Sequence, residues 1–297
     1  MTNRYVVELM TLAAIWGASF IFMRIGSPEF GAVLFMALRT LTASLFLLPI
    51  VFISKKQAGF KGYKFKIFIV GLFNTAIPFV LFGYAILTLS GGLTSVLNAT
   101  TPMFGAIVAY LWFRDKMSIT ATIGLLIGFA GVYLLMADKV SMGQSNVILP
   151  TLAALVAALC YGISANFTKR YLSGLSSIVL ASGSQVSATL VLLPISLFFM
   201  PSQLPSNSAI ISVLLVGVLC TGVAYIIFFH LIANLGPTKA ISVTYLIPAF
   251  GLLWGSLLLD EVITSSMIVG GVFILFGVAL STGLLKFNKN KTRVKAN

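Results

Sequence analysis

Long, nearly uncharged apolar segments are the feature that most limits the folds open to this chain. A helix needs ~20 apolar residues to cross the hydrocarbon core of a bilayer, and segments of that kind follow one another along the sequence. Only 8% of the residues are charged, whereas a soluble domain has about a quarter. Only helices and closed barrels satisfy their backbone in lipid, and barrel strands are short and alternating. The sequence therefore predicts an all-α integral membrane protein surrounded by the lipid bilayer.

The breaks between these segments predict ten transmembrane helices joined by short loops. They fall at charges and at clusters of Gly, Pro and Ser. The loop at 138–146 separates two halves of the chain, and residues 286–297 form a basic tail. The predicted helices cover residues 6–24, 30–53, 65–88, 92–113, 119–137, 147–168, 175–200, 208–232, 238–259 and 263–285.

The Lys and Arg residues predict the orientation, because cytoplasmic loops are enriched in both. With the N-terminus in the cytoplasm, 16 of the 19 Lys and Arg residues fall on that side. Only Arg24 and Lys139 fall on the other side, and Arg39 lies within a span. Both termini are therefore expected in the cytoplasm. This placement accounts for the net charge of +13, so we expect no nucleic-acid partner.

One pattern occurs twice, in residues 84–134 and again in residues 230–280. Shifted by 146 positions, the two stretches share ten identical residues, and Pro102 aligns with Pro248. Each proline is about halfway along its span, where a proline kinks a helix. Kinks at matched depth would widen the space between the halves. The alternative is that membrane helices simply tolerate these prolines.

The duplication predicts how the two halves sit in the membrane. Each half has five predicted helices, and an odd number inserts the second half upside down relative to the first. We expect a first five-helix repeat in residues 1–140 and a second, inverted repeat in residues 141–285, around a central cavity. Inverted repeats are typical of alternating-access carriers with a midplane site. Some channels also have them, so a passive channel or facilitator is the alternative.

Arg39 is the strongest single candidate for a functional residue, because it is near the centre of the second span. A charge there costs ~3 kcal/mol on insertion scales, so its side chain must face a cavity, a partner or free carbonyls. It would either hold the carboxylate or phosphate of a substrate or bind helix-end carbonyls and fix the fold. At the same shift of 146 positions its counterpart is Gln185, which is also polar and mid-span.

Polar and aromatic residues on four other spans complete the predicted substrate pathway. Thr94, Asn98, Thr101 and Gly105 have the spacing of a single helical face. The alternative for such residues is packing and hydrogen bonding between helices. The remaining pathway candidates are Trp16, Ser19 and Phe20 in the first span, Tyr161, Ser164 and Asn166 in the sixth, and Tyr245 in the ninth.

Glu8 and His230 are the candidates for proton coupling, since a coupled carrier needs a titratable group in its pathway. Glu8 lies about one turn inside the first span, where a helix N-terminus also favours an acid. His230 aligns with Tyr84 at the repeat shift, which favours a packing role instead.

The sequence has no arrangement of residues that predicts catalysis. Cys160 and Cys220 lie in apolar segments and are expected to be buried, free thiols. We find no metal-ligand spacing, no P-loop and no nucleophile with a base. We therefore expect no enzyme, no catalytic residue, no cofactor and no metal, but a small-molecule substrate; a homo-oligomer is left open.

Three motifs give the chain a resemblance to a known family. They are IWGASF at 15–20, MALRT at 36–40 and YLIPAFGLLWGSLLLDE at 245–261. With them the chain resembles the EamA-type, ten-helix branch of the drug/metabolite transporter superfamily. The resemblance implies a basket of helices around a central cavity, and passage of small metabolites, often amino acids or related compounds, outward across a prokaryotic inner membrane. Asp115 stands where that family usually has glutamate, and His230 where an aromatic residue is common.

Overall fold

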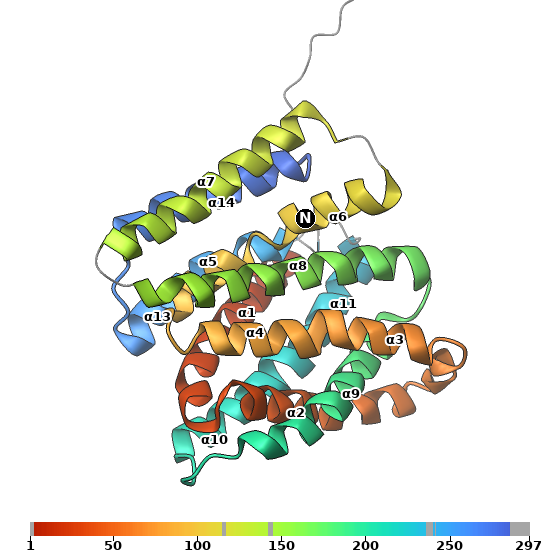
Figure 1. The fold of residues 1–297 in the computed structure, drawn as a ribbon. Helices are drawn as coiled ribbons and strands as arrows, with labels where there is room; N and C mark the ends of the chain where they lie inside the picture. Colours follow the sequence, from red (N-terminus) through yellow and green to blue (C-terminus); the bar gives the residue numbers. More distant parts are fainter. Residues whose placement is uncertain (1–2, 115–116, 142–144, 236–239, 241, 286–297) are drawn as a thin grey trace, which may run out of the picture.

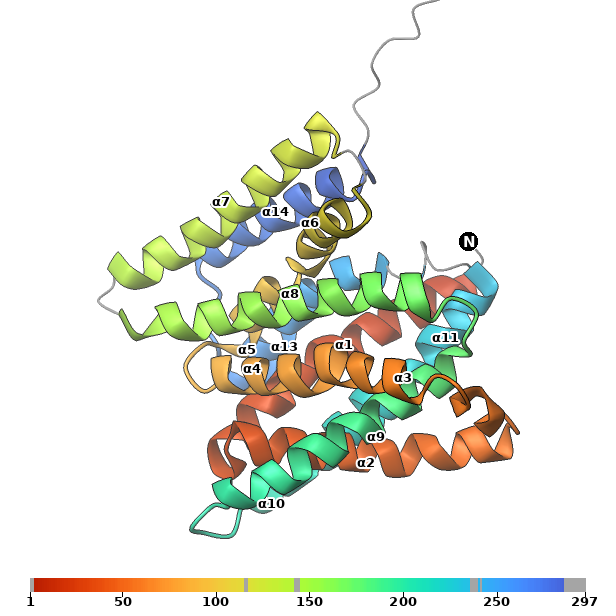
Figure 2. The same ribbon diagram turned by 45° about the vertical axis from the view of Figure 1, so that its right-hand side comes forward.

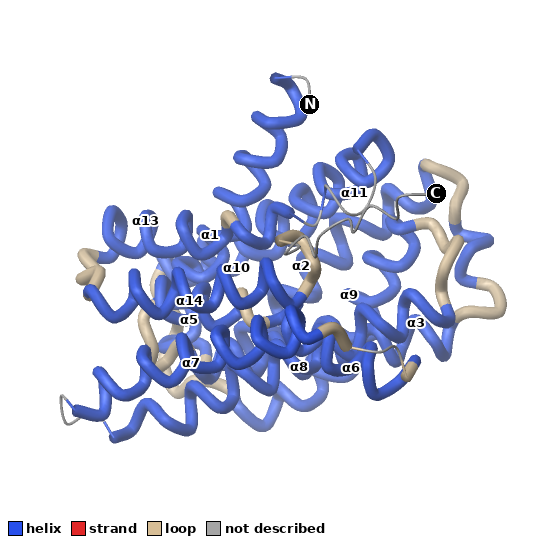
Figure 3. Tube along the Cα trace, turned by 90° about the horizontal axis from the view of Figure 1, so that it is seen from above, coloured by secondary structure: helices blue, strands red, loops and turns tan. Residues whose placement is uncertain are grey.

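The computed structural model describes residues 3–114, 117–141, 145–235, 240 and 242–285. Within these residues the chain is helical and contains no strand. Asp115 and the basic tail 286–297 lie outside the described residues. Figure 1 shows the helices packed side by side, and in Figure 3 most of the loops lie at the ends of the helices.

The helices follow one another with short connections. In chain order they are α1 (Asn3–Phe30), α2 (Ala32–Ile53), η1 (Gln57–Phe60), α3 (Lys64–Gly71), η2 (Leu72–Ala76), α4 (Ile77–Ala85), α5 (Gly91–Asn98), α6 (Thr101–Phe113), α7 (Ile119–Ser141), η3 (Ser145–Val147), α8 (Ile148–Tyr171), α9 (Ser177–Ser196), η4 (Leu197–Phe199), α10 (Asn207–Leu214), η5 (Leu215–Val223), α11 (Ala224–Leu235), η6 (Ser242–Tyr245), α13 (Ile247–Leu259) and α14 (Ser265–Ser281).

Eight helical segments of the described chain are long and apolar enough to cross a membrane. Two of them are continuous through a π-helical stretch, η2 in Lys64–Ala85 and η5 in Asn207–Leu235. Two shorter apolar helices, Val243–Leu259 and Ser265–Ser281, complete the set. This composition fits an integral membrane protein. Ten spans and an inverted arrangement stay predictions.

The regular α-helix of the fourth predicted span is interrupted for two residues, and that of the ninth span begins at a similar place. Helix α5 ends at Asn98, and α6 begins at Thr101 with Pro102 in its first turn. Helix α13 likewise begins with Pro248 in its first turn. Proline fits the first turn of each α-helix, because a first-turn N–H has no partner within the helix. The residues just before these helices, Thr100 and Leu246, keep right-handed helical backbone, and Gly91–Phe113 and Val243–Leu259 each continue through their proline as one helical span. Kinks at Pro102 and Pro248 therefore stay predictions.

Helices α6 and α13 have matching local structure. Each has 13 residues, and their first residues, Thr101 and Ile247, are 146 positions apart. Each ends at a non-glycine residue with left-handed backbone, Arg114 with φ 54° and Asp260 with φ 51°. The repeated sequence pattern is thus matched by repeated helix boundaries.

Helices α7 and α14 lie side by side in both Figure 1 and Figure 2, apart from most of the bundle. Their contact is made through glycines. A Cβ added to Gly124 would lie 2.6 Å from the carbonyl oxygen of Gly277, and one added to Gly131 would lie 2.7 Å from that of Gly270. The later glycine of α7 meets the earlier glycine of α14, so the two helices run antiparallel. Small residues at such positions let two membrane helices approach closely.

Candidate functional site

Arg39 lies in α2 and is buried, with 7% of its surface exposed. Its Nε donates to Thr221 Oγ1 at 3.2 Å, and its Nη1 donates to Met23 Sδ at 3.5 Å. The Thr221 hydroxyl in turn donates to the carbonyl of Val216 at 2.8 Å, so its oxygen is left to accept from the arginine. Residues of α1, α2 and η5 therefore meet at one guanidinium.

Aromatic rings surround this guanidinium. Its Cζ lies 3.8 Å from the centroid of the Phe79 ring, a cation–π contact. The phenols of Tyr161 and Tyr225 are close enough to interact with it electrostatically, and both residues keep part of their surface accessible. The side chain of Asn74 lies close to the phenol of Tyr225. The site therefore combines one cation with aromatic faces and hydroxyl groups.

Both π-helical stretches contribute to this cluster. Thr221 belongs to η5, and Asn74 belongs to η2. Pro78 explains η2 in part. It has no backbone N–H, so the carbonyl of Asn74 lacks the hydrogen bond that a regular α-helix would give it. π-Helical turns are rare and occur frequently at functional sites.

Arg39 has no carboxylate partner in the part of the chain that the structure describes. The ion pairs there are Arg4–Glu8 at 3.0 Å and His230–Glu8 at 2.8 Å. An unpaired cation in an apolar interior is costly. Within the described residues, the hydrogen bonds to Thr221 and Met23 and the contact with the Phe79 ring offset part of this cost.

Three predicted pathway residues lie near this cluster. Ser19 Oγ is 3.8 Å from Met23 Sδ, which accepts from Arg39. The Phe82 ring links the other two, since its centroid lies 6.0 Å from that of Phe20 and 5.9 Å from that of Tyr161. Helices α1, α4 and α8 are thus brought together at the site.

Other predicted residues have contacts elsewhere. Trp16 packs on Phe228 with a centroid distance of 5.2 Å. Asn166 Nδ2 donates to the carbonyls of Gly105 and Gly162, at 3.0 and 2.9 Å, and so joins α8 to α6. Tyr245 Oη lies 3.2 Å from Thr282 Oγ1.

The polar face of the fourth span coincides with its break. Asn98 is the last residue of α5 and is half-buried, while Thr101 begins α6. Thr101 Oγ1 is buried without a hydrogen-bond partner in the described chain. Neither residue is in contact with Arg39 through any hydrogen bond that the described residues make.

Gln185 lies in the contact between α2 and α9. It is one turn before Thr189, whose Oγ1 is 3.2 Å from Ser44 Oγ of α2, and residues four apart share a helix face. Gln185 is fully buried, and neither atom of its amide has a partner in the described chain.

The contacts of two glycines correct the pairing of Arg39 with Gln185. A Cβ added to Gly217 would lie 2.9 Å from the carbonyl oxygen of Arg39, and one added to Gly71 would lie 3.0 Å from that of Ser184. These glycines are 146 positions apart, but Arg39 and Ser184 are 145 apart. By these contacts Ser184, not Gln185, is the counterpart of Arg39. The shift changes by one residue between the second and third spans.

The two coupling candidates are in direct contact. His230 Nδ1 lies 2.8 Å from Glu8 Oε2, and Arg4 Nε donates to Glu8 Oε1 at 3.0 Å. The ring of Tyr5 packs beside His230, with centroids 6.3 Å apart. Glu8 and His230 thus form one pair between α1 and α11, which the sequence did not predict.

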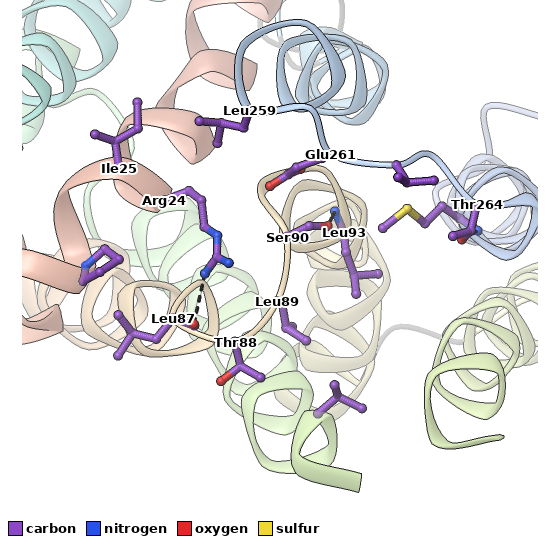
Figure 4. A pocket seen from close by; sticks show the side chains of 14 residues that line it. Arg24, Ile25, Leu87, Thr88, Leu89, Ser90, Leu93, Leu259, Glu261 and Thr264 are labelled. Atoms are coloured by element: carbon purple, nitrogen blue, oxygen red, sulfur yellow. Dashed lines mark hydrogen bonds between the residues drawn. The ribbon is translucent and has the colours of Figure 1, made fainter. Parts of the chain in front are cut away.

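An open pocket of about 780 Å³ lies where α4 ends and α5 begins, and Figure 4 shows Arg24 on one side of it and Glu261 on the other. Glu261 accepts from the backbone N–H groups of Gly91 at 2.7 Å and Gly92 at 3.0 Å. Arg24 donates to the carbonyls of Ile86 at 2.7 Å and Leu87 at 3.0 Å. Both charged groups therefore satisfy helix ends that would otherwise lack partners.

Sequence reasoning missed most of the groups around Arg39. Thr221 and Asn74 were detectable as polar residues within predicted spans, but nothing in the sequence separates them from ordinary helix contacts. Phe79 and Met23 carry no signal at all, since apolar residues fill every span. No group of His, Cys, Asp and Glu in the described residues could hold a metal ion, and Cys160 and Cys220 are free and buried.

The chain matches the model of the EamA-like transporter family twice, over residues 4–137 and 149–283. It belongs to the EamA-like transporter family. The family and the names of its relatives indicate a membrane transporter rather than an enzyme.

Two relatives and one solved structure are similar to this EamA-like chain over nearly its whole length. An uncharacterized transporter of Bacillus subtilis, YoaV, is 26% identical over 94% of this chain and 97% of its own length. A probable amino-acid metabolite efflux pump of Escherichia coli is 22% identical over 97% of this chain and 98% of its own length. A crystal structure of another protein has a TM-score of 0.67 and 14% identity, covering 96% of this chain and 99% of that one. That likeness shows a shared fold.

Proposed function

We propose that this chain is a secondary transporter that moves small metabolites outward across the cytoplasmic membrane of a prokaryote by alternating access. Amino acids or related compounds are the proposed cargo, in keeping with the probable amino-acid metabolite efflux pump among the relatives. The observation that carries the proposal is Arg39, a buried cation without a carboxylate partner in the described chain. In an apolar bundle such a group fits an anion that arrives and leaves.

The packing of equivalent helices supports the proposed inverted repeats in residues 1–140 and 141–285. Helix α2 packs on α9 and α7 on α14, while α1 packs on α13 as α8 packs on α6. The glycine contacts of α7 and α14 run antiparallel, as a two-fold axis between inverted halves requires. Ten spans would then place both termini on the same side of the membrane, and the distribution of Lys and Arg assigns that side to the cytoplasm.

We assign the substrate pathway to the cluster around Arg39. Ser19, Phe20 and Tyr161 are close to it by the contacts above, and Trp16 lies one turn before Phe20 on α1. The other pathway residues proposed from the sequence are Asn98, Thr101, Asn166, Gln185 and Tyr245. Proton coupling through the Glu8–His230 pair is part of the same proposal.

Counterflow in proteoliposomes tests the function. Liposomes holding the purified full-length chain are loaded with a candidate amino acid or organic acid, and uptake of the labelled compound is followed. A carrier gives saturable uptake that internal substrate accelerates. Flux that does not saturate and does not respond to internal substrate would favour a passive channel instead.

A further inference from the structure

We propose that the Arg39 site selects carboxylates that carry net negative charge on an apolar or aromatic body, over zwitterions with the same body. The inference rests on the proposed function and narrows its cargo from amino acids and related compounds to organic anions. Three features support it, namely the free donors of Arg39, the distribution of the acids and the arrangement of the rings.

The guanidinium of Arg39 has donors left for a ligand. A guanidinium carries five N–H donors in a planar fork, and the described chain accepts through Thr221 and Met23. The Met23 acceptor is a thioether sulfur, which accepts weakly. Nη2 has no protein partner in the described residues, so Nη1 and Nη2 can present parallel N–H groups. A carboxylate fits such a pair of donors with both oxygens.

The three glutamates of the described chain have other partners, and no described acid interacts with Arg39 to balance a second positive charge at this site. Glu8 contacts Arg4 and His230, Glu29 accepts from Ser206, and Glu261 accepts from the start of α5. A bound carboxylate neutralises Arg39. The ammonium of a zwitterion would lose its water without gaining a counter-charge, which is costly in an apolar interior.

The aromatic rings near Arg39 already have partners, which disfavours binding of an ammonium by cation–π contact. The face of Phe79 already carries the guanidinium of Arg39. Phe82 is stacked on Tyr161 at an interplanar angle of 28° and meets the ring of Phe20 at 88°. These rings are suited to pack against an apolar or aromatic body. The phenols of Tyr161 and Tyr225, which interact electrostatically with Arg39, can donate to a carboxylate as well.

A single guanidinium also favours a carboxylate over a phosphate. A dianionic group needs a second cation to balance its charge, and none contacts Arg39 in the described part of the chain. We therefore assign the site to monoanions.

Four probes with one ring and different charges test the selectivity. They are phenylacetate, phenylglycine, benzylamine and benzylphosphonate. At a pH above the second pKa of the phosphonate and below the pKa of the two ammonium groups, they present an anion, a zwitterion, a cation and a dianion. Binding to the purified, detergent-solubilised chain is measured by calorimetry, and counterflow of the same probes is measured in proteoliposomes. We expect phenylacetate to bind about 10-fold or more tightly than phenylglycine or benzylphosphonate, and benzylamine not to compete with it. Phenylglycine or benzylphosphonate binding as tightly as phenylacetate would overturn the proposal.

A matched pair of variants at Thr221 tests the charge argument without removing Arg39. Thr221→Asp places a carboxylate beside the guanidinium, and Thr221→Asn places a neutral group of the same shape there. We expect phenylacetate to bind Thr221→Asp about 10-fold or more weakly than Thr221→Asn. Equal binding by the two variants would contradict an anion site at Arg39. Size-exclusion chromatography checks that both variants fold.

The two measurements separate this inference from the proposed function. Selective binding of phenylacetate without counterflow would support the anion site and refute transport of this class. Counterflow of phenylglycine at or above the rate of phenylacetate would support the transporter and refute the selectivity.

Discussion

Glu261 joins two helices that are 170 residues apart in sequence. Its carboxylate accepts from the backbone N–H groups of Gly91 and Gly92 at the start of α5, and Glu261 itself lies two residues after the end of α13. A negative group at a helix N-terminus is also favoured by the helix dipole. Replacing Glu261 by glutamine keeps the size of the side chain and removes its charge.

The magnitude follows from the two hydrogen bonds. A hydrogen bond to a charged group contributes about 1.5–3 kcal/mol. Glutamine keeps one carbonyl acceptor but turns its NH₂ toward the second backbone N–H, so one bond is lost and the other becomes neutral. Because Glu261 is half-buried, water offsets part of the loss. We expect Glu261→Gln to destabilise the fold by about 1–2 kcal/mol.

Thermal unfolding of the detergent-solubilised chain measures this loss. The expected fall in the midpoint is about 2–8 °C. The control is Asp260→Asn, which removes the same charge from the neighbouring residue, since Asp260 is exposed and its side chain makes no hydrogen bond within the described chain. The midpoint of Asp260→Asn should change by less than about 1 °C. Equal falls in both variants would refute the capping of α5 by Glu261.

Three further predictions concern other parts of the molecule. Arg39→Ala should lower counterflow about 10-fold or more while the protein still inserts into the membrane, and unchanged flux would remove Arg39 from the pathway. Glu8→Gln and His230→Gln should each flatten the dependence of flux on pH, and because the two groups form one pair, the double variant should add little; an unaltered pH profile would remove the pair from coupling. Gly277→Ala should lower the thermal midpoint, because its Cβ would lie 2.5 Å from the carbonyl oxygen of Gly124 and the amide nitrogen of Gly128, whereas Gly105→Ala has nothing within 4 Å and should not.

The membrane class of the fold was predictable because it depends on composition along the chain. Apolar length and the small number of charges are local properties, and the described helices follow them. Whether a mid-span proline kinks or interrupts its helix cannot be predicted from the neighbouring sequence alone. At Pro102 and Pro248 the outcome depends on how the neighbouring helices take up the free backbone groups.

Of the candidate site, the sequence predicted the central residue, Arg39, but not its partners. The cost of a mid-span charge identifies Arg39 from the sequence alone. Its partners do not follow, since Thr221 is 182 positions away and contacts it through a π-helical stretch. The Glu8–His230 contact spans 222 positions. The repeat shift of 146 also misassigned the counterpart of Arg39, because a one-residue difference between the halves moves every side chain to another helix face.

Counterflow of labelled phenylacetate by the wild-type chain and by Arg39→Ala, in proteoliposomes of equal protein content, tests the central claim most directly. We expect saturable uptake that internal phenylacetate accelerates in the wild type, and loss of that acceleration in Arg39→Ala. Acceleration of the same size in both proteins would contradict a substrate site at Arg39.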